Sequence, residues 1–552
     1  MSKIKLLAIA LLSGVLMTLS WAFNMAFAPL MLFAFVPMLW VEDYISNNME
    51  KFSSTSVFRY TILPFLLFTS VNTLWISKST PVGLIIPLFE ACCMALVMQL
   101  YHFTKKVSNN SIGSYFFLML YWIALEYIQF IWDLNFPWLN LGNTFANYPV
   151  LVQWYSVLGM EGGSLWILLA NIFIFLHIRK IKRYSITPLS STKTKRLFGK
   201  YQEKVFVGLI LGLPVVWSLV LWYSYEDDNV GEVDTIVVQP NLDPYQEQFV
   251  LSPFNVTMRS INLIEPLMDD EVDYVLMPES AIQEYAWEEN IDSVASIMMF
   301  NDFLSRYKKA ELIAGVSSRR LLPKGVKTSA AREFRDAKGE YYESCNIAVD
   351  VPRSKQFDDY QIRHKSVLTP GVEKMPFAKY LSFVEKLALD MGGTVGSLGI
   401  DTTNVVFSSK VSGNKVATAI CYESVDGNYM RKFTKEGAQV LFIMTNDGWW
   451  GDTKGYKHHF AFARLRAIEN RRYIARSANT GLSGFISPKG EIIEKGHYWQ
   501  QEAFRQRLPL QNQMTFFAKN GDIIMKPFSF FAILLFVYSI VTSKVRKKPN
   551  AK

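Results

Sequence analysis

Three reactive side chains stand next to short apolar runs in this 552-residue chain. Glu279 follows the run YVLMP, Lys365 precedes a Pro/Gly turn, and Cys421 ends the run VATAI. A free thiol has a pKa of about 8.5 and is a weak nucleophile at neutral pH. A carboxylate within hydrogen-bond distance can take its proton, and a nearby ammonium group can stabilise the thiolate and then a tetrahedral oxyanion. If they meet, the three side chains predict nucleophilic catalysis.

Each of these residues also has an ordinary structural explanation. Free cysteine is among the most buried residue types, so Cys421 could simply be packed in a core. Glu279 could cap a helix, and Lys365 could be a solvated loop residue. His458 and His459 are adjacent on an expected helix and lack a ligand constellation, so we expect neither a metal nor a cofactor.

The elements that must position these residues lie within 224–526, where short apolar runs alternate with amphipathic helices. This pattern indicates an α/β layered domain. Expected strands cover 234–239, 274–278, 312–317, 345–350, 416–421, 440–445, 473–478 and 484–488, and expected helices cover about 255–268, 292–308, 427–437 and 457–471. Because strand ends converge on a cleft in such folds, the reactive residues could meet there. The basic segment 318–342 and residues 381–403 are interpreted as loops or insertions.

Long apolar runs outside this domain predict a membrane protein, because a spanning helix needs about 20 mostly apolar residues. We expect about eight spans, near 5–22, 25–41, 57–77, 83–103, 113–132, 160–178, 204–223 and 527–543. The expected domains are therefore a membrane domain of about seven spans at 1–223, the α/β domain at 224–526, and the last span with a basic tail at 527–552.

Charge predicts the orientation of these parts. Lys and Arg gather at one set of helix ends and in the loop 179–204, whereas the opposite loops carry only Lys78. By the positive-inside rule both termini are cytoplasmic, and seven preceding spans place 224–526 on the far side of the membrane. That domain has 36 Lys and Arg against 40 Asp and Glu, so the net charge of +9 belongs to the membrane flanks and indicates no nucleic-acid partner. Four cysteines make no disulfide framework.

Several motifs resemble those of a known family. PES at 278–280, the segment from Lys365 to Glu373, and CYE at 421–423 resemble the Glu-Lys-Cys triad of the nitrilase, or carbon–nitrogen hydrolase, superfamily. Residues 445–491 and 124–143 resemble signatures of its membrane-bound branch, the apolipoprotein N-acyltransferases. This resemblance implies a nitrilase-like four-layer α-β-β-α sandwich beside the spanning helices.

The resemblance also implies roles for single residues. Glu279 would be the general base, Lys365 would stabilise the oxyanion, and Cys421 would carry the acyl group as a thioester. Three further residues fall on positions that support the site in the family: Glu373, Tyr422 and Glu423. Substrate-binding candidates at the next strand end are Asn446, Trp449 and Trp450; the two tryptophans suit a lipid-facing mouth, although core packing is an equal alternative.

The implied reaction is a ping-pong acyl transfer. A phospholipid donates an acyl chain to the thiol, and the α-amine of the N-terminal S-diacylglyceryl-cysteine of an apolipoprotein accepts it, giving a triacylated lipoprotein. The expected setting is the bacterial inner membrane, with the catalytic domain in the periplasm, membrane lipid around the spans, and a monomeric enzyme. Two alternatives remain: a membrane-tethered amidase or nitrilase acting on a small amide, and a non-catalytic receptor or assembly protein.

Overall fold

The computed structural model describes residues 1–546 apart from 187–192, 229, 249, 354–358, 375–396, 402 and 404. The expected loop at 381–403 therefore falls mostly outside the described residues, as does the end of the basic tail at 547–552. The chain divides into two compact units. One comprises Met1–Leu74, Val82–Ser224 and Asp522–Lys552, and the other comprises Trp75–Pro81 and Tyr225–Gly521.

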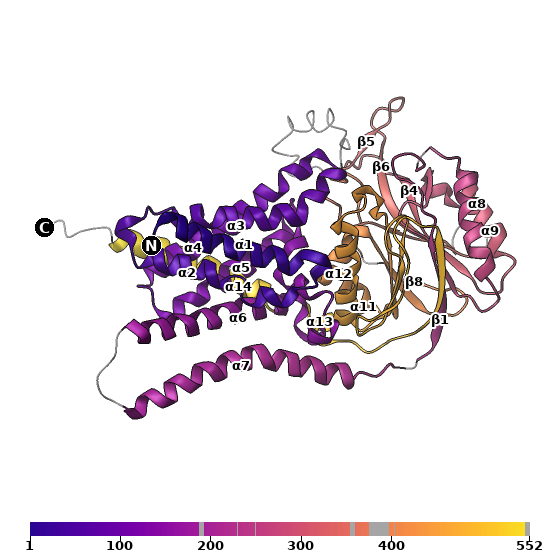
Figure 1. Cartoon of the computed structure of the whole chain (residues 1–552). Helices are drawn as coiled ribbons and strands as arrows, with labels where there is room; N and C mark the ends of the chain where they lie inside the picture. Colours follow the sequence, from indigo (N-terminus) through magenta and orange to yellow (C-terminus); the bar gives the residue numbers. More distant parts are fainter. Residues whose placement is uncertain are drawn as a thin grey trace. The chain divides into compact units, whose positions relative to one another are not determined.

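The first unit is helical (Figure 1). Eight helices of the described residues are long and apolar enough to cross a membrane. The α-helices in these eight stretches are α1 (Lys3–Met25), α2 (Val36–Ser46), α3 (Ser56–Thr73), α4 (Ile86–Val107), α5 (Phe117–Ile131), α6 (Tyr155–Ile186), α7 (Lys193–Tyr223) and α14 (Met525–Arg546). The prediction of a polytopic helical part with about eight spans is confirmed.

The second unit contains two sheets. The larger has the order β14-β1-β2-β4-β6-β5, with β3 also paired to β4 and β7 to β6. Its strands are β1 (Glu232–Gln239), β2 (Tyr274–Leu276), β3 (Ile282–Trp287), β4 (Glu311–Leu321), β5 (Arg332–Glu333), β6 (Tyr341–Val351), β7 (Gln361–His364) and β14 (Glu502–Pro509). The β1, β2 and β4 strands run parallel, whereas β4 and β6 are antiparallel.

The smaller sheet has the order β13-β12-β11-β10-β9-β8. Its strands are β8 (Phe407–Ser408), β9 (Lys415–Ile420), β10 (Val440–Thr445), β11 (Ile474–Ala478), β12 (Gly484–Ile486) and β13 (Ile492–Lys495). Because β9, β10 and β11 are parallel, their carboxyl ends meet at one edge. Cys421 and Asn446 directly follow two of these strands.

Strand alternation builds the layers. On β4, Ile313 packs between the two sheets, whereas Leu312 and Ala314 pack against the helices on the other face. Helices α8 (Pro253–Ile264) and α9 (Ala295–Leu304) cover the larger sheet, and α11 (Gly427–Lys435) and α12 (Lys454–Asn470) cover the smaller one (Figure 1). A short helix, α13 (Phe516–Asn520), follows β14. The four-layer α-β-β-α prediction is confirmed.

The structure corrects the expected strands in two ways. The segment 318–342 is not entirely loop, because β4 continues to Leu321, β5 occupies Arg332–Glu333 and β6 begins at Tyr341. Pairing over ten positions extends β4 and β6 past the apolar stretch, where the side chains are polar or aromatic. The strands β3, β7, β8, β13 and β14 were not expected, because none of them is a long uninterrupted apolar run.

Candidate active site

Glu279 follows β2, and the residue is 8% exposed. The Asn346 side-chain amide donates to its Oε1 at 2.7 Å, and the Asn446 backbone N–H donates to its Oε2 at 3.2 Å. A Cβ on Gly315 of β4 would lie 2.7 Å from the Cα of Glu279, so glycine is required for this close approach. The larger sheet and the β10 end therefore hold the carboxylate together.

Lys365 follows β7 and lies between two carboxylates. Its Nζ is 3.0 Å from Glu279 Oε1 and 2.8 Å from Glu373 Oε1. Burial alone would lower the pKa of Lys365, but the two carboxylates raise it well above its usual value. Burial would likewise raise the pKa of Glu373, but the ammonium of Lys365 and the Thr369 backbone N–H lower it. The lysine is therefore a fixed positive charge.

Cys421 directly follows β9 in a strained backbone conformation, with φ at 51°. A non-glycine residue in the left-handed region is uncommon and often belongs to a functional site. The residue is 9% exposed. Burial, followed by the charge of Glu279, raises the pKa of the thiol, while Lys365 acts in the opposite direction. Cys421 thus lies within the electrostatic reach of both residues and needs a base to ionise.

Glu423 stabilises the turn at Cys421 through buried hydrogen bonds. Its carboxylate accepts hydrogen bonds from the backbone N–H groups of Ile420 at 2.7 Å and Ser366 at 2.6 Å. The Arg363 guanidinium lies 2.7 Å from both of its oxygens, and both side chains are fully buried. Glu423 therefore ties the cysteine turn to the segment that carries Lys365. Tyr422, which lies between Cys421 and Glu423 in the sequence, is also buried and is 6% exposed.

A second buried network lies behind the cysteine. Nε2 of His459 is 3.2 Å from the carbonyl oxygen of Cys421, and its Nδ1 is 2.9 Å from Asp447 Oδ1. Arg476 pairs with Asp447 at 2.6 Å. Burial, followed by the charge of Arg476, lowers the pKa of His459. The network fixes the backbone that presents the thiol.

The tryptophans after β10 make an aromatic cluster that includes residues from far along the chain. Trp450 meets Trp75 edge to face at a centroid distance of 4.9 Å, and Trp449 meets Tyr245 at 5.3 Å. The Tyr245 hydroxyl also donates to the carbonyl oxygen of Lys78 at 3.2 Å. Residues 75–81, which separate α3 from α4 in the sequence, thus form part of the second unit.

The side chain of Asn446 forms hydrogen bonds to other side chains of the protein. The amide donates to Gln248 at 2.7 Å, and its oxygen accepts from Asn479 at 3.3 Å. Its contact with the reactive residues is the backbone N–H on Glu279. The geometry therefore favours a positioning role for Asn446 over a substrate contact through its side chain.

The sequence did not identify Asn346 or Trp75 as site residues. Asn346 bridges Glu279 and Glu373, to which its amide donates at 2.7 and 3.2 Å. The available signal was a single amide inside the apolar strand CNIAVD. No feature of the sequence pointed to Trp75 as a site residue, because only the fold brings it to Trp450.

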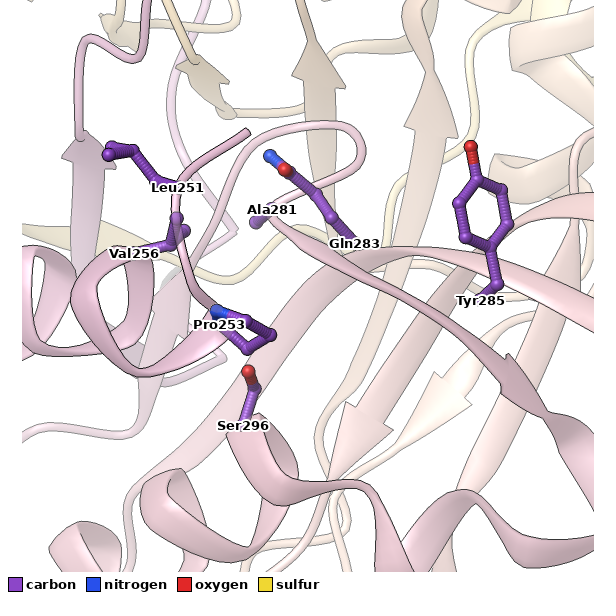
Figure 2. A pocket seen from close by; sticks show the side chains of 7 residues that line it. All are labelled: Leu251, Pro253, Val256, Ala281, Gln283, Tyr285 and Ser296. Carbon is purple, nitrogen blue, oxygen red and sulfur yellow. The ribbon is translucent and has the colours of Figure 1, made fainter. Parts of the chain in front are cut away.

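A cavity of about 140 Å³ lies beside β3 (Figure 2). The residues lining it are Leu251, Pro253, Val256, Ala281, Gln283, Tyr285 and Ser296. Figure 2 shows Ser296 at the start of its helix, facing Pro253, and Ala281 and Gln283 on the neighbouring segment. Ala281 is two residues beyond Glu279, so the cavity adjoins the segment that carries the reactive carboxylate.

A buried ionic cluster is formed by side chains from β6, from β7 and from the segment that follows β3. One possible ligand atom each from Glu288, Cys345 and His364 lies within 4.8 Å of the others. Burial alone would lower the pKa of His364, but Asp401, Cys345 and Glu288 raise it to about 11. A protonated imidazole has no lone pair for a metal, and Arg320 lies 3.4 Å from its Nε2. The cluster therefore fits an ion-pair network that anchors β7.

Comparison with known proteins gives matches on both units. Residues 13–173 match the family model described as the Apolipoprotein N-acyltransferase N-terminal domain, and residues 252–511 match that described as Carbon-nitrogen hydrolase. The chain is thus a membrane protein that carries a carbon–nitrogen hydrolase domain. It belongs to the apolipoprotein N-acyltransferase family, whose N-terminal domain and hydrolase domain it contains in that order.

Relatives of that name align along nearly the whole chain. An Apolipoprotein N-acyltransferase of Chlorobaculum tepidum is 28% identical over 533 residues, covering 93% of this chain and 92% of that protein. One of Rickettsia typhi is 26% identical over 539 residues, covering 94% of this chain and 96% of that protein. Among solved structures, Saccharomyces cerevisiae Nit3, a member of branch 10 of the nitrilase superfamily, aligns with a TM-score of 0.36 and 14% identity, over 52% of this chain and 93% of Nit3.

Proposed function

We propose that this enzyme transfers a fatty acyl chain from a phospholipid to the N-terminal amine of a diacylated apolipoprotein through a thioester on Cys421. The observation that carries the proposal is the Lys365 ammonium held between Glu279 and Glu373 next to a strained, buried cysteine. This arrangement supplies a nucleophile, a base and a fixed positive charge, which are the parts that acyl transfer requires.

In the first half-reaction, Glu279 takes the proton of the Cys421 thiol as sulfur attacks the ester carbonyl carbon of the phospholipid. Lys365 stabilises the negative charge that develops on the carbonyl oxygen. The ester C–O bond then breaks, the proton returns from Glu279 to the leaving alkoxide, and a lysophospholipid departs. Sulfur keeps the acyl group as a thioester.

In the second half-reaction, the α-amine of the acceptor attacks the thioester carbon. Glu279 accepts a proton from the amine, Lys365 again stabilises the oxyanion, and the C–S bond breaks as the C–N bond forms. The proton on Glu279 returns to sulfur. An amide and a free thiol result, so the enzyme is regenerated without net change in protons or electrons.

The substrates explain why such a domain is attached to a membrane. Both carry acyl chains, and an enzyme held at the bilayer meets them by two-dimensional diffusion. The strong Lys/Arg bias of the loops supports a location in the bacterial inner membrane with both termini in the cytoplasm and the catalytic domain in the periplasm. We infer a monomer, because one chain supplies every side chain in the scheme.

The proposal is tested by incubating the full-length protein with phospholipid alone and measuring the intact mass. We expect a gain of one acyl chain on the peptide that contains Cys421. A diacylated lipopeptide added afterwards should remove that mass and become triacylated. An unmodified Cys421 under turnover would overturn the thioester. Hydrolysis of a small amide without any acyl transfer would favour the amidase alternative.

A further inference from the structure

Arg319 on β4 differs from the neighbouring arginine in what surrounds it. Arg320 is neutralised by Glu343 at 2.7 Å and Asp401 at 3.3 Å. The Arg319 guanidinium instead faces three aromatic rings at 5.5, 5.8 and 5.9 Å, those of Tyr285, Trp287 and Tyr342. Within the described part of the chain, no carboxylate pairs with it. A partly exposed cation is therefore held in place by rings but not neutralised.

The aromatic rings form a continuous platform. The Trp287 ring stacks on Phe334 at 5.8 Å, and Phe334 lies 4.9 Å from Tyr342. The register pairs Trp287 with Arg319 across β3 and β4, and Arg319 with Ser344 across β4 and β6. The platform is thus built on three paired strands.

This platform continues the catalytic face of the larger sheet. Ser317 and Arg319 are two residues apart on β4, so they project from the same face and lie about 7 Å apart along the strand. The Ser317 hydroxyl donates to Ser280, the residue after Glu279, at 3.3 Å. Its cross-strand partner Asn346 donates to Glu279. Arg319 therefore lies one strand repeat from Ser317, which contacts the residue after Glu279.

The charge of the platform fits one part of the donor, its phosphodiester. Guanidinium groups bind phosphate oxygens in a bidentate manner.

We propose that Arg319, held on the Tyr285–Trp287–Tyr342 platform, binds the phosphodiester of the phospholipid donor and so places its ester near Cys421. This inference rests on the proposed function, since it assigns part of the donor site. Tyr285 also lines the cavity beside β3, which leaves space next to the bound phosphate.

The test compares two acyl donors on the full-length protein in detergent micelles. One is dipalmitoylphosphatidylglycerol, and the other is p-nitrophenyl palmitate, which lacks a phosphate. The readout is the rate of thioester formation on Cys421 by intact mass, as a function of donor concentration. For Arg319→Met we expect the half-saturating phospholipid concentration to rise about 10–100-fold, with loading by the nitrophenyl ester unchanged. For Arg319→Lys, the half-saturating phospholipid concentration should lie between those of the wild type and Arg319→Met.

Arg335→Met is the matched control, because it removes the same charge from the same hairpin at an exposed position. We expect it to load like the wild type from both donors. Equal losses of Arg319→Met with both donors, or no loss with either, would overturn the inference. Competition by inorganic phosphate at the donor's own concentration would assign the site to a free anion instead. A wild type that loads from neither donor would refute the proposed function itself.

Discussion

The ammonium of Lys365 donates a 3.0 Å hydrogen bond to Oε1 of Glu279, although 86 residues separate them in the chain. Oε2 of the same carboxylate is engaged by the backbone N–H of Asn446. The proposed base is thus oriented before substrate arrives by contacts that do not involve the side chain of Cys421. This independence makes the contributions of base and nucleophile separable by mutation.

Replacement of the nucleophile should abolish acyl transfer and leave the fold intact. For Cys421→Ser we expect a loss of at least ~10³-fold in triacylated product, because the serine hydroxyl is a poorer nucleophile in the same site. Product formation is measured by mass spectrometry and folding by thermal unfolding. Cys345→Ser in the same unit serves as the control. Substantial transfer by Cys421→Ser would exclude the thioester route.

Removal of the base should slow ionisation of the thiol. Burial raises the pKa of Cys421, so little thiolate forms at neutral pH without a proton acceptor. We expect Glu279→Gln to slow acyl loading of Cys421 from phospholipid by about 10²–10⁴-fold, because no carboxylate takes the thiol proton as sulfur attacks. The loading rate, measured by intact mass, should recover with increasing pH, as hydroxide replaces the base. A loading rate equal to that of the wild type at neutral pH contradicts the role of Glu279.

The buried pair of Arg363 and Glu423 should dominate local stability. Either Glu423→Gln or Arg363→Met leaves one charge buried without its partner, and we expect a loss of about 3–5 kcal/mol in the free energy of unfolding. The double replacement by methionine should restore part of that loss. Thermal unfolding of the full-length protein measures all three. Single variants as stable as the wild type would mean that the turn does not depend on this pair.

The aromatic cluster should affect long acyl chains more than short ones. Trp75→Ala removes the ring that packs on Trp450. An aromatic pair contributes about 0.5–1.5 kcal/mol, so we expect a roughly 2–10-fold slower loading from a long-chain donor and little change with a short-chain donor. The exposed Trp499→Ala is the control. Equal effects on both chain lengths would assign Trp75 to packing alone.

The cluster around His364 predicts a pH dependence of stability. Its pKa is raised to about 11, against about 6.5 in an unfolded chain, by Asp401, Cys345 and Glu288, with Arg320 facing the same ring. The stabilisation is therefore complete below about pH 6.5 and is lost as the pH rises toward about 11. The difference in thermal midpoint between wild type and His364→Gln should be larger at about pH 6 than at about pH 10. A constant difference would exclude a charged imidazole.

The expected helices and the central strands follow from residue patterns, namely apolar residues at helical spacing or short β-branched apolar runs. The run VATAI predicts a buried strand, and β9 covers it. The short strand β7 has no such signal, since QIRH carries two basic side chains. Its position depends on buried partners for Arg363 and His364, which come from distant segments.

The amino-acid sequence by itself determined which groups could do chemistry, where the spans lie, and which family the chain resembles. Those properties depend on residue type and local order. Only the tertiary structure decided that Asn346 bridges two carboxylates, that Trp75 meets Trp450, and that Arg319 faces rings while Arg320 faces acids. Such contacts join residues that are distant in the chain or that differ only in the face of a strand, and packing rather than local sequence selects them.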